Sequence, residues 1–194
     1  MYSDTANKML AALGEILERE GVGPVDVVIC GAMALAMQGI IDRPTRDIDG
    51  LGLVITKRGR LVLSKPLMSN EFNQAVERVG IHFGAGKFWF STAATILHDD
   101  TRLPRDLIKR AEMRQYGSHL TVRLCSRPDM VCLKMWAAIK RGEPDIGDLV
   151  QMRISEKEAE NAVRWCLEQD GEARPDLIVV LKEVGHGRLA ERLS

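Results

Sequence analysis

The chain begins with apolar positions at helical spacing and continues with a short apolar run that is typical of a strand. Within residues 6–17 the apolar side chains recur three or four positions apart, which predicts an amphipathic helix. Residues 25–30 are mostly β-branched and predict a buried strand. Gly31 follows at once, and residues 32–38 are good helix formers that Gly39 ends. The order predicted for this stretch is therefore helix, strand, glycine turn and helix.

A loop then leads to a second predicted strand, which runs from about Asp47 to Ile55. Because successive strand side chains point to opposite faces, Asp47 and Asp49 are expected on one face and Ile48 on the other. The sequence thus predicts two carboxylates side by side on one face of the strand. Further predicted elements are a basic hairpin-like turn or loop at 57–60, a helix from Ser69 to Gly80, some strand within 81–97, a helix over 104–113 whose basic face includes Arg114, and a strand over 119–125.

After residue 125 the pattern becomes helical throughout. Ser155 and Glu158 have the spacing of a capping box, and residues 185–187 are expected to break the last helix before a short tail. A soft boundary near Cys125 divides the chain into domains at 1–125 and 126–194, which we expect to share an interface. The predicted helices begin at or near Ser126, Pro144, Ser155 and Pro175.

The composition is that of an ordinary globular protein, with 194 residues of which 45% are hydrophobic. Basic and acidic residues number 27 each, so a polyanionic partner would have to be bound by a local patch. The four cysteines form no C-x-x-C pair, which indicates buried, reduced thiols in a cytoplasmic protein. No apolar run is long enough for a bilayer, so we expect no membrane association. Trp89, Trp136 and Trp165 are expected in the core.

Two neighbouring carboxylates repel each other unless a proton or a divalent cation lies between them. Here they follow a strand and a glycine turn into a helix, an order that brings backbone N–H groups close to the carboxylate pair. Such N–H groups bind phosphate oxygens and carboxylates bind the metal that bridges them, so the pattern favours a triphosphate site. The alternative is a strand edge whose charges deter aggregation.

Other polar residues also allow two interpretations. Lys134 lies within an apolar helix, where it could face a ligand or extend its ammonium group to solvent from a buried stem. Asp145 and Asp148 could belong to a site or could be first-turn acids favoured by the helix dipole. His98, followed by Asp99–Asp100, has the composition of a metal cluster, although its loop-like setting favours an exposed turn.

At these residues the sequence resembles a known family. The segment 29–32, Gly39, Arg43, Thr45, Arg46 and Asp47–Asp49 look like the first motif of the nucleotidyltransferase superfamily. The nearest likeness is to the minimal bacterial type, especially AbiEii-like toxins of toxin–antitoxin systems. A second motif of those proteins is similar to Lys134, Ala138, Arg141, Asp145 and Asp148–Leu149. Together the two motifs span about 120 residues of the chain.

The resemblance implies an α+β fold, with a small mixed β-sheet flanked by helices and followed by a C-terminal helical part. It implies an enzyme that uses Mg²⁺ and a nucleoside triphosphate such as ATP to transfer a nucleotidyl group to an RNA (tRNA) or protein acceptor. A further implication is a toxin role with a cognate antitoxin as partner. Carried over by position, the metal ligands would be Asp47 and Asp49, the catalytic residues would be Asp47, Asp49, Lys134 and Asp148, and the nucleotide-binding residues would be Gly31, Ala32, Thr45, Arg46, Lys134 and Asp145.

The sequence departs from the family pattern at two places. Ala32 stands where the family usually has Gly or Ser, and the strand over 119–125 offers Thr121 and Arg123 where many members have a third carboxylate. These departures support a second hypothesis, a catalytically degenerate protein that binds a nucleotide or a partner without turnover. A third hypothesis is a glycosyltransferase that uses a metal-bound sugar nucleotide. It suits the sequence less well, because the Asp-x-Asp motif comes early and little chain remains for an acceptor domain.

Overall fold

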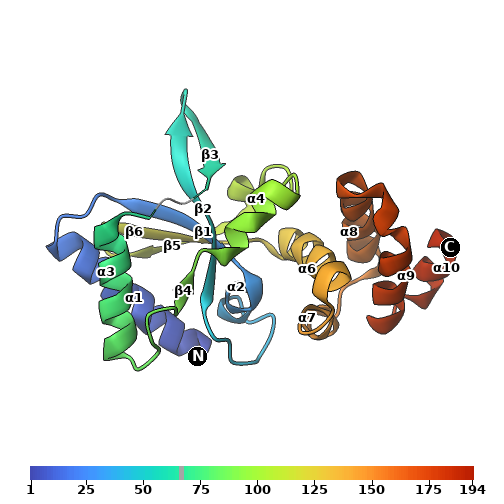
Figure 1. Cartoon of the computed structure of the whole chain (residues 1–194), viewed down its shortest axis with the longest axis horizontal. Coiled ribbons are helices and arrows are strands. Elements are labelled where there is room, and N and C mark those ends of the chain that lie inside the picture. Colours follow the sequence, from blue (N-terminus) through green and yellow to red (C-terminus); the bar gives the residue numbers. More distant parts are fainter. Residues whose placement is uncertain (66–67) are drawn as a thin grey trace. The chain divides into compact units, whose positions relative to one another are not determined.

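The computed structural model describes residues 1–65 and 68–194, together with their side chains except those of residues 99 and 100. The chain divides into two compact units, Met1–Ser126 and Arg127–Ser194, so the division falls one residue after the expected boundary. Figure 1 shows the elements of both units in chain order by colour. The strands of the described residues all belong to the first unit, and the second unit is helical. The mixed α+β class expected from the sequence is confirmed.

The first unit is organised by a mixed sheet with β1 at its centre. The strand order is β3-β2-β1-β6-β5, and the short β4 pairs with β2 outside that order. β1 pairs antiparallel with β2 and parallel with β6, so it is hydrogen-bonded on both sides. The strands are β1 (Val25–Cys30), β2 (Ile48–Lys57), β3 (Arg60–Ser64), β4 (Phe90–Ser91), β5 (Glu112–Tyr116) and β6 (Leu120–Leu124).

The pairing of β1 with β2 contains a β-bulge. Val28 lies opposite Gly52 while the next residue, Ile29, lies opposite Gly50, so Leu51 is an extra residue on β2. Beyond the bulge, Cys30 lies opposite Asp49. The bulge therefore sets which residue of β2 meets the end of β1.

Helices α1 (Ser3–Arg19) and α3 (Asn70–His82) pack beside each other in the first unit (Figure 1). The apolar stripe of α1, including Leu10 and Leu13, is fully buried in one core cluster with Val27 and Ile29 of β1. As predicted, Ser69 caps α3, and its hydroxyl accepts a hydrogen bond from the Phe72 N–H at 3.2 Å. The remaining helices of this unit are α2 (Gly31–Met37), the 3₁₀ turn η1 (Ala93–Ile96), α4 (Leu97–Asp100) and α5 (Leu107–Arg110).

The helix predicted over 104–113 is largely wrong. Only Leu107–Arg110 is helical, and the chain then enters β5, which pairs antiparallel with β6. Arg114 therefore lies on a strand, where its guanidinium donates a hydrogen bond to the Met37 carbonyl at 2.9 Å. The gain from a complete ladder with β6 outweighs the local helix preference.

In the second unit the helices are α6 (Arg127–Arg141), α7 (Asp145–Met152), α8 (Glu156–Gln169), η2 (Gly171–Ala173), α9 (Arg174–Glu183) and α10 (Gly187–Leu193). The predicted capping box at Ser155 and Glu158 is confirmed. The predicted short tail is wrong, because α10 forms there and buries Leu189 and Ala190. Burial of these two side chains against the rest of the unit explains why the chain resumes a helix after the break.

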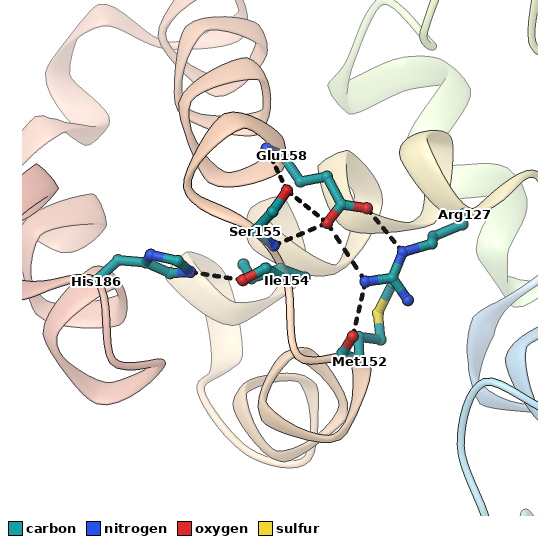
Figure 2. A network of polar contacts seen from close by, with 6 residues as sticks. All are labelled: Arg127, Met152, Ile154, Ser155, Glu158 and His186. Carbon is teal, nitrogen blue, oxygen red and sulfur yellow. Dashed lines mark hydrogen bonds and ion pairs between the residues drawn. The ribbon is translucent and has the colours of Figure 1, made fainter.

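Figure 2 shows how polar contacts join the helices of the second unit. The Arg127 guanidinium donates to Glu158 Oε1 at 2.7 Å and to the Met152 carbonyl at 2.7 Å. The same Glu158 carboxylate accepts from the Ser155 N–H at 2.8 Å. These bonds hold the start of α6 against the start of α8. The hydrogen bond from Arg127 is the largest cause that lowers the pKa of Glu158 to about 2.

The cysteines and tryptophans agree in part with the sequence analysis. Cys30, Cys125 and Cys166 are buried, and burial raises the pKa of the Cys166 thiol. Trp89 is fully buried, and its indole N–H donates to the Val76 carbonyl at 2.7 Å. Trp136 is also buried, whereas Trp165 is only half-buried and meets Trp136 edge-on at 6.2 Å between ring centroids. None of the helices in the described residues has the length and apolar character needed to cross a membrane.

Candidate functional site

The Asp-x-Asp motif lies where β2 begins, next to the turn between β1 and α2. Ile48 is fully buried in the core cluster, while Asp47 and Asp49 on either side of it are half-buried. Since residues paired across an antiparallel ladder share a face, Asp49 lies on the face of Cys30, opposite the core of α1 and α3. The alternation predicted from the sequence is thus present at Ile48 and Asp49.

Gly31 is the residue that brings backbone and carboxylate together. A Cβ atom at this position would lie 2.0 Å from Asp49 Oδ2, far inside any real contact. The φ angle of Gly31 is +74°, a left-handed conformation that residues with side chains rarely adopt. Both the space and the backbone conformation therefore require glycine here. The consequence is a carboxylate that lies directly over the first residue of α2.

Neighbouring residues fix the start of β2 from two sides. The Thr45 hydroxyl donates to the Asp47 carbonyl at 3.1 Å, and the Thr45 N–H donates to the Met1 carbonyl at 2.9 Å. On the other side Asp49 lies opposite Ser91 of β4 in a parallel register. The ring Nε2 of His98 lies 2.8 Å from the Leu51 carbonyl, two residues along β2. The carboxylate of Asp49 therefore projects from a backbone that is held on both edges.

The other residues that the resemblance assigns to the nucleotide differ in exposure. Ala32, the second residue of α2, is buried, Thr45 is half-buried and Arg46 is exposed. Among these three, Arg46 is thus the side chain most open to solvent and Thr45 is engaged with the backbone of the Asp-x-Asp motif. Their roles toward a nucleotide stay predictions.

The second group of predicted residues forms a buried ion cluster inside the second unit. The Lys134 ammonium lies 2.6 Å from Asp145 Oδ1 and 2.6 Å from Asp148 Oδ2. Both carboxylates are fully buried, and Lys134 as a whole is 5% exposed. The guanidinium of Arg141, one turn before α7, also binds the Asp145 carboxylate. Two positive and two negative groups are thus gathered between α6 and α7.

This geometry removes the simpler interpretations of these residues. Lys134 is not a lysine that extends from a buried stem into solvent, because its ammonium group is itself buried between two carboxylates. Asp145 and Asp148 do lie in the first turn of α7, but their burial goes beyond what a surface helix start requires. Removing two charges from water is costly unless each is paired, and the cluster supplies that pairing.

Asp47 and Asp49 belong to the first unit, and Lys134, Asp145 and Asp148 belong to the second. The structure brings together Gly31 with Asp49, and Lys134 with both later acids. That the second group completes the site of the first concerns the relation between the units and stays a prediction.

Sequence reasoning missed an ion pair on the neighbouring strands. Arg123 of β6, the strand on which the resemblance implies a third carboxylate, donates two bonds of 2.8 Å to the Asp26 carboxylate of β1. The hydrogen bond from Asp26 is the main cause that raises the pKa of Arg123. The parallel register of β1 with β6 brings the two residues together, and no local pattern in the sequence predicts such a register. The position is therefore occupied by a neutralised arginine.

In the described part of the chain, no three His, Cys, Asp or Glu side chains gather as a group that could hold a metal ion. The side chains of Asp99 and Asp100 lie outside that part, so the suggested cluster with His98 is not described. Mg²⁺ is commonly bound by only one or two carboxylates, with water and substrate phosphates as its other ligands. The donor set of Asp47 and Asp49 fits that mode of binding.

Comparison with known proteins adds no assignment. No protein-family profile matches the chain, and no curated protein or solved structure was found to be similar to it.

Proposed function

We propose that the protein is a Mg²⁺-dependent nucleotidyltransferase, with a nucleotidyltransferase-like fold, that transfers a nucleotidyl group from a nucleoside triphosphate to an RNA or protein acceptor. The observation that carries the proposal is the contact between Gly31 and Asp49, where a Cβ would lie 2.0 Å from the carboxylate oxygen. Glycine costs conformational entropy in an ordinary strand-to-helix connection. At Gly31 the missing side chain would let phosphate oxygens approach both the backbone and the Asp49 carboxylate.

In the proposed reaction an acceptor hydroxyl attacks the α-phosphorus of the nucleotide. The new P–O bond forms as the bond to pyrophosphate breaks, and the hydroxyl proton leaves to a base or to water. Asp47 and Asp49 would hold Mg²⁺, which would neutralise charge on the triphosphate when bound. The N–H groups at the start of α2 have no partner within the helix and would face phosphate oxygens. Lys134, Asp145 and Asp148 enter the proposal only through the resemblance of the second motif.

A second candidate is a protein of the same fold that binds a nucleotide or a partner without turnover. Two observations favour it. Ala32 is buried and has no hydroxyl to offer, and Arg123 forms an ion pair with Asp26 on the strand where the resemblance implies a third carboxylate. A toxin role with a cognate antitoxin would follow from the first candidate and requires transfer activity.

The test is transfer of label from α-phosphate-labelled nucleoside triphosphates, each supplied with Mg²⁺ and with either total RNA or cell extract. We expect label transfer by the wild-type chain and its loss in Asp49→Asn and in Gly31→Ala. The matched control is Asp42→Asn, which removes the same charge from an exposed position in the loop before the motif. Asp42→Asn should transfer label as the wild type does.

Each outcome separates the candidates. Equal transfer by Asp49→Asn and the wild type would contradict the enzyme assignment. Nucleotide binding in calorimetry without label transfer would favour the second candidate. Binding of a sugar nucleotide in place of nucleoside triphosphates would support the glycosyltransferase hypothesis instead.

A further inference from the structure

The strand that carries Asp49 continues into a hairpin that projects beyond the rest of the sheet (Figure 1). β2 and β3 pair from Leu53 with Ser64 to Lys57 with Arg60. Arg58 and Gly59 form the turn, with φ angles of 51° and 74°. Two successive residues with positive φ match the right-handed twist of a two-residue hairpin. Residues 55–61 are all exposed, so this tip is not part of the core of the first unit.

The hairpin concentrates positive charge in a chain whose basic and acidic residues are equal in number, 27 of each. Between Asp49 and Glu71 the sequence contains no acidic residue. Lys57, Arg58 and Arg60 stand together at the tip, and within the described residues none of the three forms an ion pair. Three exposed cations at a projecting turn repel one another, so an anionic partner would stabilise them.

A second basic segment lies against the same hairpin. α5 contacts β3, and the connection that contains it, residues 101–111, has one acidic residue against four basic ones. That acid, Asp106, is bound by Lys109, with 2.6 Å between carboxylate and ammonium. The hydrogen bond from Lys109 lowers the pKa of Asp106 below its ordinary value. The hairpin tip and the connection that contacts β3 therefore both carry a net positive charge.

The apolar residues of the tip do not form a continuous face. Ile55 lies opposite Val62, whereas Leu61 lies opposite Thr56 on the other side of the ribbon. Exposed Ile55 and Leu61 thus point away from each other, which disfavours burial in a membrane or in an apolar groove of a protein. What both sides of the ribbon share is the charge at its tip.

We propose that the β2–β3 hairpin is an arm that binds the phosphate backbone of an RNA, through Lys57, Arg58 and Arg60. Guanidinium groups bind phosphate oxygens in a bidentate manner, and ammonium groups bind them as point charges. Of the two acceptor classes in the proposed function, RNA and protein, the charge of the arm fits RNA. This choice of acceptor rests on the proposed function, whereas binding of RNA by the arm does not depend on it.

The length of β2 sets the minimum length of an RNA that would contact both Asp49 and the basic tip. Eight residue steps separate Asp49 from Lys57, which is about 26 Å at roughly 3.3 Å per residue. A mononucleotide cannot span that length, but a chain of about eight nucleotides can, at roughly 3.4 Å each. An RNA end at Asp49 could therefore reach the basic tip along one strand of the protein.

The test is fluorescence anisotropy of a labelled 12-nucleotide RNA with the full chain, measured over a series of salt concentrations. The variant is Lys57→Gln/Arg58→Gln/Arg60→Gln. Its matched control is Lys8→Gln/Lys157→Gln/Lys182→Gln, which removes three positive charges from exposed helix positions elsewhere. Thermal unfolding of both variants checks that they remain folded.

We expect the hairpin variant to lose about tenfold to a hundredfold in RNA affinity at ~0.1 M salt, and its log–log salt slope to fall in magnitude by about 2, as three lost phosphate contacts require. The control should change both quantities much less. Arg58→Lys/Arg60→Lys, which keeps the charge, should retain most of the affinity.

Equal affinities and slopes for the hairpin variant and its control would overturn the proposal. So would binding of a poly-glutamate peptide as tight as that of RNA, which would indicate an acidic protein partner, or no RNA binding by the folded wild type. Because the anisotropy measurement contains no nucleoside triphosphate, it tests the arm apart from the transfer reaction. Intact RNA binding without label transfer would therefore count against the proposed function alone, and label transfer to protein without RNA binding would count against the arm alone.

Discussion

Two pairs of aspartates, one in each unit, have similar sequence spacing and opposite surroundings. Asp47 and Asp49 begin a strand and are half-buried beside a glycine whose backbone Asp49 touches. Asp145 and Asp148 begin a helix, are fully buried, and bind one lysine between them at 2.6 Å each. Spacing alone would assign both pairs to a site. Burial and packing separate them, because the first pair is half-buried beside the start of α2 and the second is fully buried around its lysine.

The difference teaches how a lysine and two acids can be ambiguous in a sequence. A buried ammonium between two carboxylates is a buried salt bridge that forms on folding, and removing the ammonium lowers the free energy of unfolding. The half-buried pair is proposed to act on a ligand, so we expect its loss to change mainly the stabilisation that an added ligand gives. Mutations therefore distinguish the pairs by the quantity that changes.

The largest expected effect is that of Lys134→Met. Removing the ammonium leaves the buried carboxylates of Asp145 and Asp148 without the cation they share, so the free energy of unfolding should fall by about 3–5 kcal/mol. Chemical denaturation of the full chain measures this change. Adding Asp148→Asn to Lys134→Met should recover part of the loss, since it removes one of the two buried charges.

Lys140→Met is the matched control on the same helix. Its ammonium lies 3.5 Å from Asp170, and its side chain is 53% exposed. The loss should stay below about 1 kcal/mol. If the two substitutions cost the same, the contrast between a buried cluster and a surface pair would be wrong.

A smaller effect, with a pH dependence, is expected at Glu158. Its pKa of about 2 in the folded chain lies below its ordinary value of 4.5, so its contribution is complete above pH 4.5 and is lost as the pH falls toward 2. Glu158→Gln should cost about 1 kcal/mol at pH 7, and the difference from the wild type should shrink on acidification. Thermal unfolding across this pH range measures it.

Glu183→Gln, at an exposed position of α9, provides the control for that pH series. Its difference from the wild type should be small at every pH. A Glu158→Gln effect that stays constant or grows as the pH falls would show that the Arg127 contact does not depend on the charge of the carboxylate.

The smallest effect on stability is expected for Asp49→Asn. Because Asp49 is half-buried and the substitution keeps the size of its side chain, the free energy of unfolding should fall by about 0.5 kcal/mol or less. Mg²⁺ with a nucleoside triphosphate should raise the melting temperature of the wild type and leave that of Asp49→Asn unchanged. A large loss of stability without ligand would place Asp49 with the structural acids of the second unit.

Locally encoded features were predictable from the sequence. The strand at 25–30, the glycine turn at Gly31 and the capping box at Ser155 depend on neighbours within a few positions, and each forms as predicted. β5 was not predicted from the sequence, because its pairing with β6 depends on the partner strand more than on its own residues. α10 formed where a short tail was expected, because it buries apolar side chains against the unit.

The candidate site divides along the same line. Alternation predicted the arrangement of Ile48 and Asp49, and the structure has it. The Asp26–Arg123 pair could not be predicted, since it depends on the parallel register of β1 and β6. The burial of Lys134 depends on how α6 and α7 pack, which the apolar pattern of either helix leaves open.

The bulge in β2 decides which side chain this strand presents at the end of β1. Because Leu51 has no partner on β1, Asp49 lies opposite Cys30; in a ladder without the bulge Leu51 would pair with Ile29, Gly50 would take that place and the carboxylate would fall beyond the end of β1. Gly31 would then face a hydrogen atom instead of an oxygen. The position of the carboxylate thus depends on an irregularity of the ladder, and a change at residues 50–52 that restored regular pairing with Leu51 in place would move it by one residue.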